Sequence, residues 1–238
     1  MSYVQSKDHE LITLVDWLQF TIPFPFTLEQ VYELLKIPKD EFKDMPRGLY
    51  SYTKQKAAGD IRILYEGNSD MGIHIQLSGQ GCRQYETYYE ADWLALFGRI
   101  DAAGGKWARL DIAVDDIRYN DSPPYFRLRQ LIAKVKRNEC KSKFKTARRV
   151  ETLEIGGGKS KGQTIYFGSS QSDIQVRAYE KDLERLNAGK ELEQNLTAWN
   201  RVEIQMCDER AENAILAILT GFPPGEIAFG ILSHYMDF

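Results

Sequence analysis

The sequence has few of the residues that build disulfide frameworks or zinc sites. It contains 3 cysteines and 3 histidines in 238 residues, with no Cys-x-x-Cys pair and no His-hydrophobe-His motif. Cysteines this few and this widely spaced exclude a disulfide scaffold and a zinc ribbon. They are typical of reduced thiols, which predicts a cytoplasmic protein. Any metal site must then be built mainly from carboxylates, with at most His74 helping.

Long hydrophobic runs are also absent, so the sequence predicts no membrane span. Its net charge is −3, whereas domains that bind nucleic acid are usually basic. The exception lies between residues 134 and 149, where basic side chains outnumber acidic ones by eight to one. This run is either an ordinary solvated segment or a surface that steers DNA. The candidate DNA-binding residues in it are Lys141, Lys143, Lys145, Arg148 and Arg149.

What the sequence does contain is a tyrosine between two cations. Residues 164–167 and 175–179 read as two strands joined by a polar turn, and the two-residue period places Arg177, Tyr179 and Lys181 on one face. A tyrosine in this setting could attack a phosphodiester, because the cations stabilise both the phenolate and the phosphate. The alternative is a half-exposed sheet face, where all three residue types are common.

A second polar face follows from the alternation between residues 109 and 116. Arg109, Asp111 and Asp115 share this face, opposite an apolar one. The Cα atoms of Asp111 and Asp115 would lie roughly 13 Å apart in a strand, so the two bind one metal ion only if the strand bends. Asp111 could instead pair with a carboxylate of a neighbouring strand. An Arg/Asp ladder on a solvated face is the alternative.

The third polar face belongs to residues 199–206, where Arg201 and Glu203 point away from the core. Glu203 is the best candidate partner for Asp111, because Mg²⁺ and Mn²⁺ prefer carboxylate oxygens. Asp115 and Glu154 are reserve ligands. Together the three strands offer the residues of a metal-dependent phosphoryl-transfer site. The cations that could neutralise the phosphate there are Arg177, Lys181, Arg109 and Arg201.

The order of elements predicts an α+β fold made of two similar α/β half-units, with mainly antiparallel strands joined into a central sheet and helices packed on one side. Residues 1–11 are expected to be an N-terminal tail, 12–120 the first half, and 121–238 the second half with the nucleophile. Further strands are expected near 15–22, 61–65, 73–77 and 152–155. Helices are expected at 28–35, within 85–103, and near 125–137, 181–194 and 209–219. The glycine-rich segment 156–162 lacks P-loop spacing and is interpreted as a hairpin loop.

The two halves echo each other. Aligned on Asp70 and Asp173, the first hairpin places His74 opposite Arg177 and Gln76 opposite Tyr179. Each half then continues through a helical stretch to a strand that begins with arginine, which makes Asp111 and Glu203 equivalent. If the repeat is real, only the second half carries the nucleophile.

These segments together resemble the Rep_trans family, which comprises rolling-circle replication initiators of plasmids and phages and relaxases of conjugative elements. The resemblance covers roughly residues 12–238. The matching segments are 15–20, 71–83, 109–116, 164–172, 177–181 and 201–205.

The resemblance implies an enzyme that nicks one DNA strand at an origin and stays attached through a 5′-phosphotyrosine. Tyr179 would be the nucleophile, and nearby carboxylates would hold a divalent metal, Mg or Mn. The implied partners are single-stranded or extruded origin DNA, a second copy of the chain, and a helicase.

Two rival functions remain open at this point. A binding-only initiator or repressor would recognise DNA without cutting it. A hydrolytic nuclease would use metal-activated water, so that Tyr179 would be merely structural and no covalent adduct would form.

Overall fold

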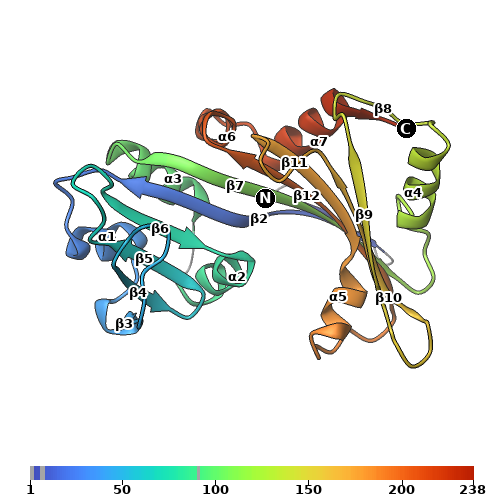
Figure 1. Cartoon of the computed structure of the whole chain (residues 1–238), viewed down its shortest axis with the longest axis horizontal. Helices are drawn as coiled ribbons and strands as arrows, with labels where there is room; N and C mark the ends of the chain where they lie inside the picture. Colours follow the sequence, from blue (N-terminus) through green and yellow to red (C-terminus); the bar gives the residue numbers. More distant parts are fainter. Residues whose placement is uncertain (1–2, 6–8, 90–91) are drawn as a thin grey trace. The chain divides into compact units, whose positions relative to one another are not determined.

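The computed structural model describes residues 3–5, 9–89 and 92–238, which form an α+β fold with a large antiparallel sheet, as predicted (Figure 1). The chain forms two compact units. Unit 1 comprises Met1–Leu14, Ile112–Gln205 and Pro223–Phe238, and unit 2 comprises Val15–Asp111 and Met206–Phe222. The predicted halves, 12–120 and 121–238, stay a prediction. Within the described part of the chain, no helix is long and apolar enough to cross a bilayer.

Unit 2 contains an antiparallel meander with helices packed against it. Its strands are β3 (Lys43–Asp44), β4 (Lys54–Ala58), β5 (Ile61–Tyr65), β6 (Ile73–Leu77) and parts of β2 (His9–Ile22) and β7 (Lys106–Tyr119). They follow the order β3-β4-β5-β6-β2-β7. Its helices are α1 (Leu28–Leu35), the 3-10 helix Lys39–Glu41, α2 (Gly79–Tyr88), α3 (Trp93–Ala102) and α6 (Glu209–Leu219). Helix α3 contacts α1 and α6, while α2 lies against β5 and β6.

Local sequence explains the helix boundaries of unit 2. Thr27 and Gln30 form the predicted capping box of α1, in which each side chain accepts from the other residue's backbone N–H. Ser78 caps α2 through its side-chain oxygen, which accepts from the backbone N–H of Gly81. Position 81 in this helix requires glycine, because a Cβ there would lie 2.5 Å from the carbonyl oxygen of Asp60. The predicted apolar stripe of α3 is core, since Phe97 is fully buried and packs edge-on against Trp107.

Unit 1 repeats the scheme of a meander followed by a helix and a long strand. Its strands run in the order β7-β12-β11-β10-β9. They are β9 (Ala147–Leu153), β10 (Ser160–Phe167), β11 (Ile174–Glu180), β12 (Leu196–Cys207) and the second part of β7. Strand β1 (Tyr3–Gln5) pairs with β2, and β8 (Lys141–Ser142) with β13 (Met236–Asp237). The helices are α4 (Leu128–Lys136), α5 (Lys181–Asn187) and α7 (Pro224–Tyr235).

Three expectations about elements are corrected. The strand expected at 152–155 is β9, which begins earlier at Ala147 and takes in the end of the basic run. The helical stretch within 85–103 is two helices, α2 and α3, whose junction includes residues outside the described part. Helix α7 was not expected, because it opens on Pro-Pro-Gly and these residues usually interrupt a helix. Proline at the first position of a helix is nevertheless favourable, since its missing N–H needs no partner there.

Candidate active site around Tyr179

The predicted hairpin carries Tyr179 and Arg177 on the same face of β11. Thr164 lies opposite Tyr179 and Tyr166 lies opposite Arg177 in the β10–β11 ladder. Residues directly opposite each other in a ladder share a face, so all four side chains lie on one side of the unit 1 sheet. The other side is apolar, with Val176 and Ala178 buried. This amphipathic pattern is what fixes the register and therefore the direction of Tyr179.

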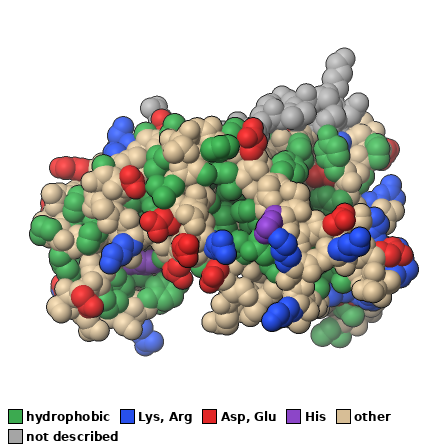
Figure 2. All heavy atoms as spheres, turned by 90° about the horizontal axis from the view of Figure 1, so that it is seen from above, with side chains coloured by type: hydrophobic (Ala, Val, Ile, Leu, Met, Phe, Trp, Pro, Cys, Tyr) green, Lys and Arg blue, Asp and Glu red, His purple; other side chains and the backbone are tan. Residues whose placement is uncertain are grey.

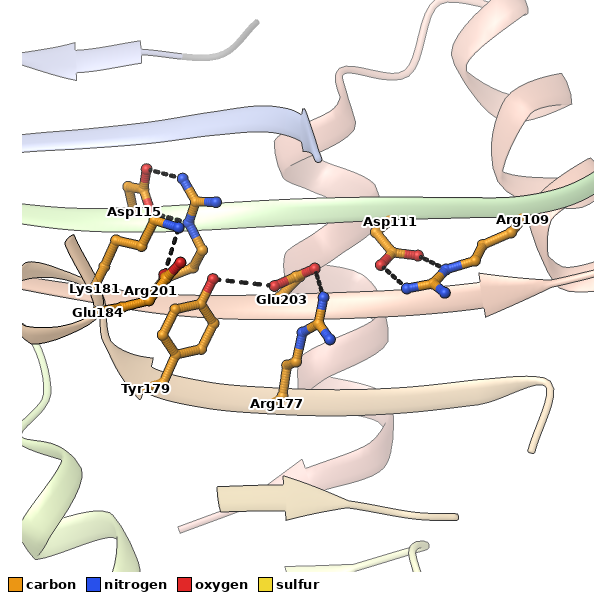
Figure 3. A network of polar contacts seen from close by, with 9 residues as sticks. All are labelled: Arg109, Asp111, Asp115, Arg177, Tyr179, Lys181, Glu184, Arg201 and Glu203. Carbon is orange, nitrogen blue, oxygen red and sulfur yellow. Dashed lines mark hydrogen bonds and ion pairs between the residues drawn. The ribbon is translucent and has the colours of Figure 1, made fainter. Parts of the chain in front are cut away.

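Glu203 on β12 joins Tyr179 to Arg177. The Tyr179 hydroxyl donates to Glu203 Oε2 at 3.3 Å, and the Arg177 guanidinium pairs with Oε1 of the same carboxylate (Figure 3). Glu203 is only 1% exposed, and the Arg177 side chain is 30% exposed. The arrangement therefore places an acceptor for the tyrosine proton and a cation within reach of one hydroxyl.

Lys181 reaches the same tyrosine from a different element than expected. Strand β11 ends at Glu180, so Lys181 is the first residue of α5 and does not belong to a strand face. Its Nζ atom still lies 5.6 Å from the centre of the Tyr179 ring. The ammonium also pairs with Glu184 at 2.5 Å, one helical turn further on. A cation placed over the face of an aromatic ring is attracted to it electrostatically.

Asp115 and Arg201 form a buried ion pair between β7 and β12. Both oxygens of Asp115 accept from Arg201, at 2.6 and 2.7 Å, and both side chains are at most 5% exposed. A solvated ladder, one of the two alternatives for the polar face of β7, is therefore wrong for Asp115. Arg201 would have to leave this pair to reach DNA, and its role as a DNA ligand stays a prediction.

Asp111 has an arginine of its own on the same strand. Arg109 donates to both Asp111 oxygens at 2.7 and 2.6 Å, and its guanidinium also stacks on Trp17 at 4.5 Å. Asp111 is fully buried, so the solvated ladder is wrong here as well. These contacts all lie within unit 2.

The predicted metal ligands do not fit a divalent ion as they lie. Asp111, Asp115 and Glu203 are each paired with a different arginine, which already neutralises the carboxylate. Across residues 3–5, 9–89 and 92–238, no three His, Cys, Asp or Glu side chains come together. The reserve ligand Glu154 is a half-exposed hairpin residue 3.5 Å from Lys161. Dependence on Mg or Mn stays a prediction.

The basic run lies on the surface of unit 1. All five candidate DNA-binding residues within 141–149 are exposed, and Figure 2 shows Lys and Arg side chains gathered toward the right of the view among fewer acids. Arg149 is paired with Glu151, and the Arg148 guanidinium lies over the ring of Tyr166. The run is therefore exposed and partly stacked on the face that carries Tyr179.

A small cavity opens beside the nucleophile candidate. Its volume is about 140 Å³, and Tyr179, Thr164 and Val150 line it together with Lys161 and Asn187. Sequence reasoning did not single out Thr164, Val150 or Tyr166. The available signal was the alternation along β10, in which residues 163, 165 and 167 are buried and Thr164 and Tyr166 lie on the other face.

Comparisons with known proteins agree with one another. The family model described as "Replication initiation factor" (Rep_trans) matches residues 105–238, and that described as "Rolling Circle replication initiation protein N-terminal domain" matches residues 12–99. The proposed DNA relaxase NicK of Bacillus subtilis (strain 168) is 30% identical over 238 residues. That match covers 98% of this chain and 66% of the relative, so the chain spans just under two thirds of its length.

A solved structure gives the same answer. The rolling circle replication initiator protein from Geobacillus stearothermophilus superposes with a TM-score of 0.85 at 37% identity. The match covers 96% of this chain and 86% of that one. Since the first family model alone spans more than half of the sequence, this chain belongs to the Rep_trans family of replication initiation factors.

Proposed function

We propose that this chain is a DNA-nicking replication initiator or relaxase that cuts one strand at an origin by attack of Tyr179. The observation that carries the proposal is the hydrogen bond from Tyr179 to the buried Glu203 carboxylate, in a chain of this family. The names of the relatives support the same reaction class.

In the proposed reaction, Tyr179 Oη forms a bond to a backbone phosphorus while its proton passes to Glu203. The bond from phosphorus to the 3′ oxygen breaks, and the departing oxygen takes up a proton from solvent. The products are a 5′-phosphotyrosyl enzyme and a free 3′-hydroxyl. A tyrosine ordinarily ionises near pH 10, so an adjacent carboxylate that accepts the proton makes attack feasible at neutral pH.

Arg177 and Lys181 supply the positive charge. Arg177 lies on the face of the nucleophile and is partly exposed, so it could turn from Glu203 toward a phosphate oxygen as charge builds there. Lys181 lies over the Tyr179 ring and favours the phenolate. The predicted cytoplasmic location, the second copy of the chain and the helicase partner remain parts of this proposal.

The test is a covalent adduct assay. The wild type and Tyr179→Phe are incubated with labelled single-stranded oligonucleotides that tile the DNA around the gene, with Mn²⁺ and separately with a chelator. We expect a protein–DNA band on a denaturing gel that Tyr179→Phe lacks and that the control Tyr125→Phe keeps. Dependence of the band on added metal tests the predicted cofactor.

The rival functions give different results in the same assay. Cleavage without a covalent band would mean a hydrolytic nuclease. Binding without cleavage of any tile would mean a non-catalytic origin-binding protein.

A further inference from the structure

Two parallel rows of side chains cross the face of unit 1 that carries Tyr179. The β9–β10 ladder places Val150 opposite Thr164, and the β10–β11 ladder places Thr164 opposite Tyr179. The first row is therefore the nucleophile row. The second row lies two residues along each strand and consists of Arg148, Tyr166 and Arg177.

The second row contains a stacked pair. The Arg148 guanidinium lies 4.8 Å from the centre of the Tyr166 ring. Arg148 is exposed and Tyr166 is half-buried, so the stack stands on the surface and outside the core. Residues diagonal to each other on one sheet face lie about 7–8 Å apart, which makes Tyr166 a direct neighbour of Tyr179.

Such a stack fits one class of ligand. Unstacked nucleobases lie on aromatic rings and on guanidinium planes, and arginines along the same groove bind the phosphates between them. Arg177 closes the row on its other side and already contacts the site through Glu203. A single DNA strand offers a flat base for the stack and a phosphate for the exposed Arg148 guanidinium, whereas an apolar ligand would match the ring alone.

We propose that Tyr166, with Arg148 stacked on it, is a base-stacking platform that holds the nucleotide beside the scissile phosphate of single-stranded DNA. This inference rests on the proposed function. The platform positions the strand so that the phosphate lies over Tyr179, and it reads no particular base, because every base has a stacking face. Tyr166 is thus a DNA-binding residue and has no part in the bond-making step.

The test measures binding without cleavage. In the Tyr179→Phe background, fluorescence anisotropy gives the Kd of a mixed-sequence single-stranded oligonucleotide and of an abasic strand of the same length and charge. We expect the background protein to prefer the base-bearing strand. Adding Tyr166→Ala should reduce that preference by roughly 5- to 150-fold, the effect of losing one stacked base. Tyr166→Phe, which keeps the ring, should preserve it.

A matched control comes from the same unit. Tyr125 is an exposed tyrosine under an arginine, Arg118, at 4.3 Å, but it lies on the loop between β7 and α4. Tyr125→Ala should leave the preference for bases unchanged. Circular dichroism melting of Tyr166→Ala shows whether the sheet is intact, and Tyr166→Phe keeps the test valid if it is not.

The inference is overturned if Tyr166→Ala is folded and retains the same base-to-abasic ratio. It is also overturned if the background protein does not distinguish the two strands. Neither result bears on the covalent adduct of the wild type, so failure of the platform and failure of the nicking reaction are told apart.

Discussion

Glu203 has a separate partner on each carboxylate oxygen, the Tyr179 hydroxyl on one and the Arg177 guanidinium on the other. A buried carboxylate held in this way has a fixed orientation toward the hydroxyl, as the proposed acceptor of the Tyr179 proton needs. The same residue was predicted as a metal ligand, and the residue types alone could not separate the two roles.

Exchange of this carboxylate for an amide tests the role. Glu203→Gln keeps the shape but is not basic, so we expect adduct formation to slow by about 10²–10⁴-fold, the usual contribution of a general base. The Kd for single-stranded DNA should change far less. Rates come from timed denaturing gels. Glu151→Gln, in another close Arg–Glu pair of unit 1, is the control and should cut at nearly the wild-type rate.

His74 makes the stability of unit 2 depend on pH. Its Nδ1 atom lies at hydrogen-bond distance, 2.9 Å, from the Thr21 hydroxyl, and its ring stacks beside Tyr52. Burial lowers the pKa of His74 from 6.5 to about 4. Between these two pH values the unfolded chain binds a proton that the folded chain does not. The free energy of unfolding is therefore highest above pH 6.5 and falls as the pH drops toward 4.

At pH 4.5 the loss due to His74 should be about 2–3 kcal/mol. Urea unfolding at pH 7 and pH 4.5 measures it, and the comparison with His74→Gln removes the contribution of carboxylates common to both proteins. The variant should lose less stability between the two pH values. An identical loss in both proteins would mean that His74 is protonated in the folded state.

At the scale of elements, the ion pair between Asp115 and Arg201 ties β7 to β12. Both members are buried, so removal of one leaves an uncompensated charge in the sheet. We expect Arg201→Ala to lower the free energy of unfolding by about 3–5 kcal/mol. The exposed pair Arg137–Glu139 is the control, and Arg137→Ala should change it by no more than about 0.5 kcal/mol. Urea midpoints measure both, and equal effects would contradict the burial argument.

Elements with one buried face were predictable from the sequence. Strands β5 and β6 have the expected bounds, and β11 extends one residue beyond them at each end, because apolar residues alternate along them. Strand β9 was not located correctly, since all seven of its residues are exposed and no alternation marks it. It is a strand because it pairs along β10, and that pairing is decided by the tertiary fold.

The contacts of the candidate site were likewise only partly predictable from the sequence. Alternation predicted the faces of Tyr179, Asp111 and Glu203, but it said nothing about register between strands. The contact between Arg177 and Glu203 joins residues 26 positions apart and depends on how β11 meets β12. The pair of Arg109 with Asp111 is the exception, because two residues on one strand face are neighbours in any register.

At the scale of the whole molecule, the two units use one scheme with different side chains. In unit 2, Gln76 lies opposite Arg62 on the hairpin and its amide oxygen accepts from Gln19 at 2.9 Å. In unit 1 the residue that the predicted repeat aligns with Gln76 is Tyr179, which bonds to Glu203. An amide cannot attack phosphorus as a phenolate can, so if the repeat is real, the proposed nucleophile belongs to unit 1 alone.

The distribution of charge over the chain determines which part of it attracts DNA electrostatically. The net charge is −3, so any electrostatic attraction must come from the local basic run. Replacement of Lys141, Lys143 and Lys145 by Gln should reduce the slope of log K against log salt for single-stranded DNA by about 2, or about 0.7 for each phosphate that is no longer neutralised.

The control for this prediction has the same net charge. Three exposed lysines of unit 2, Lys36, Lys39 and Lys106, are changed to Gln instead. Anisotropy titrations at several salt concentrations should give the wild-type slope for this control. If both triple variants lower the slope equally, the total charge of the chain governs binding. If only the first does, the single strand binds along the basic run, whose Arg148 lies over Tyr166, despite the acidic balance of the whole molecule.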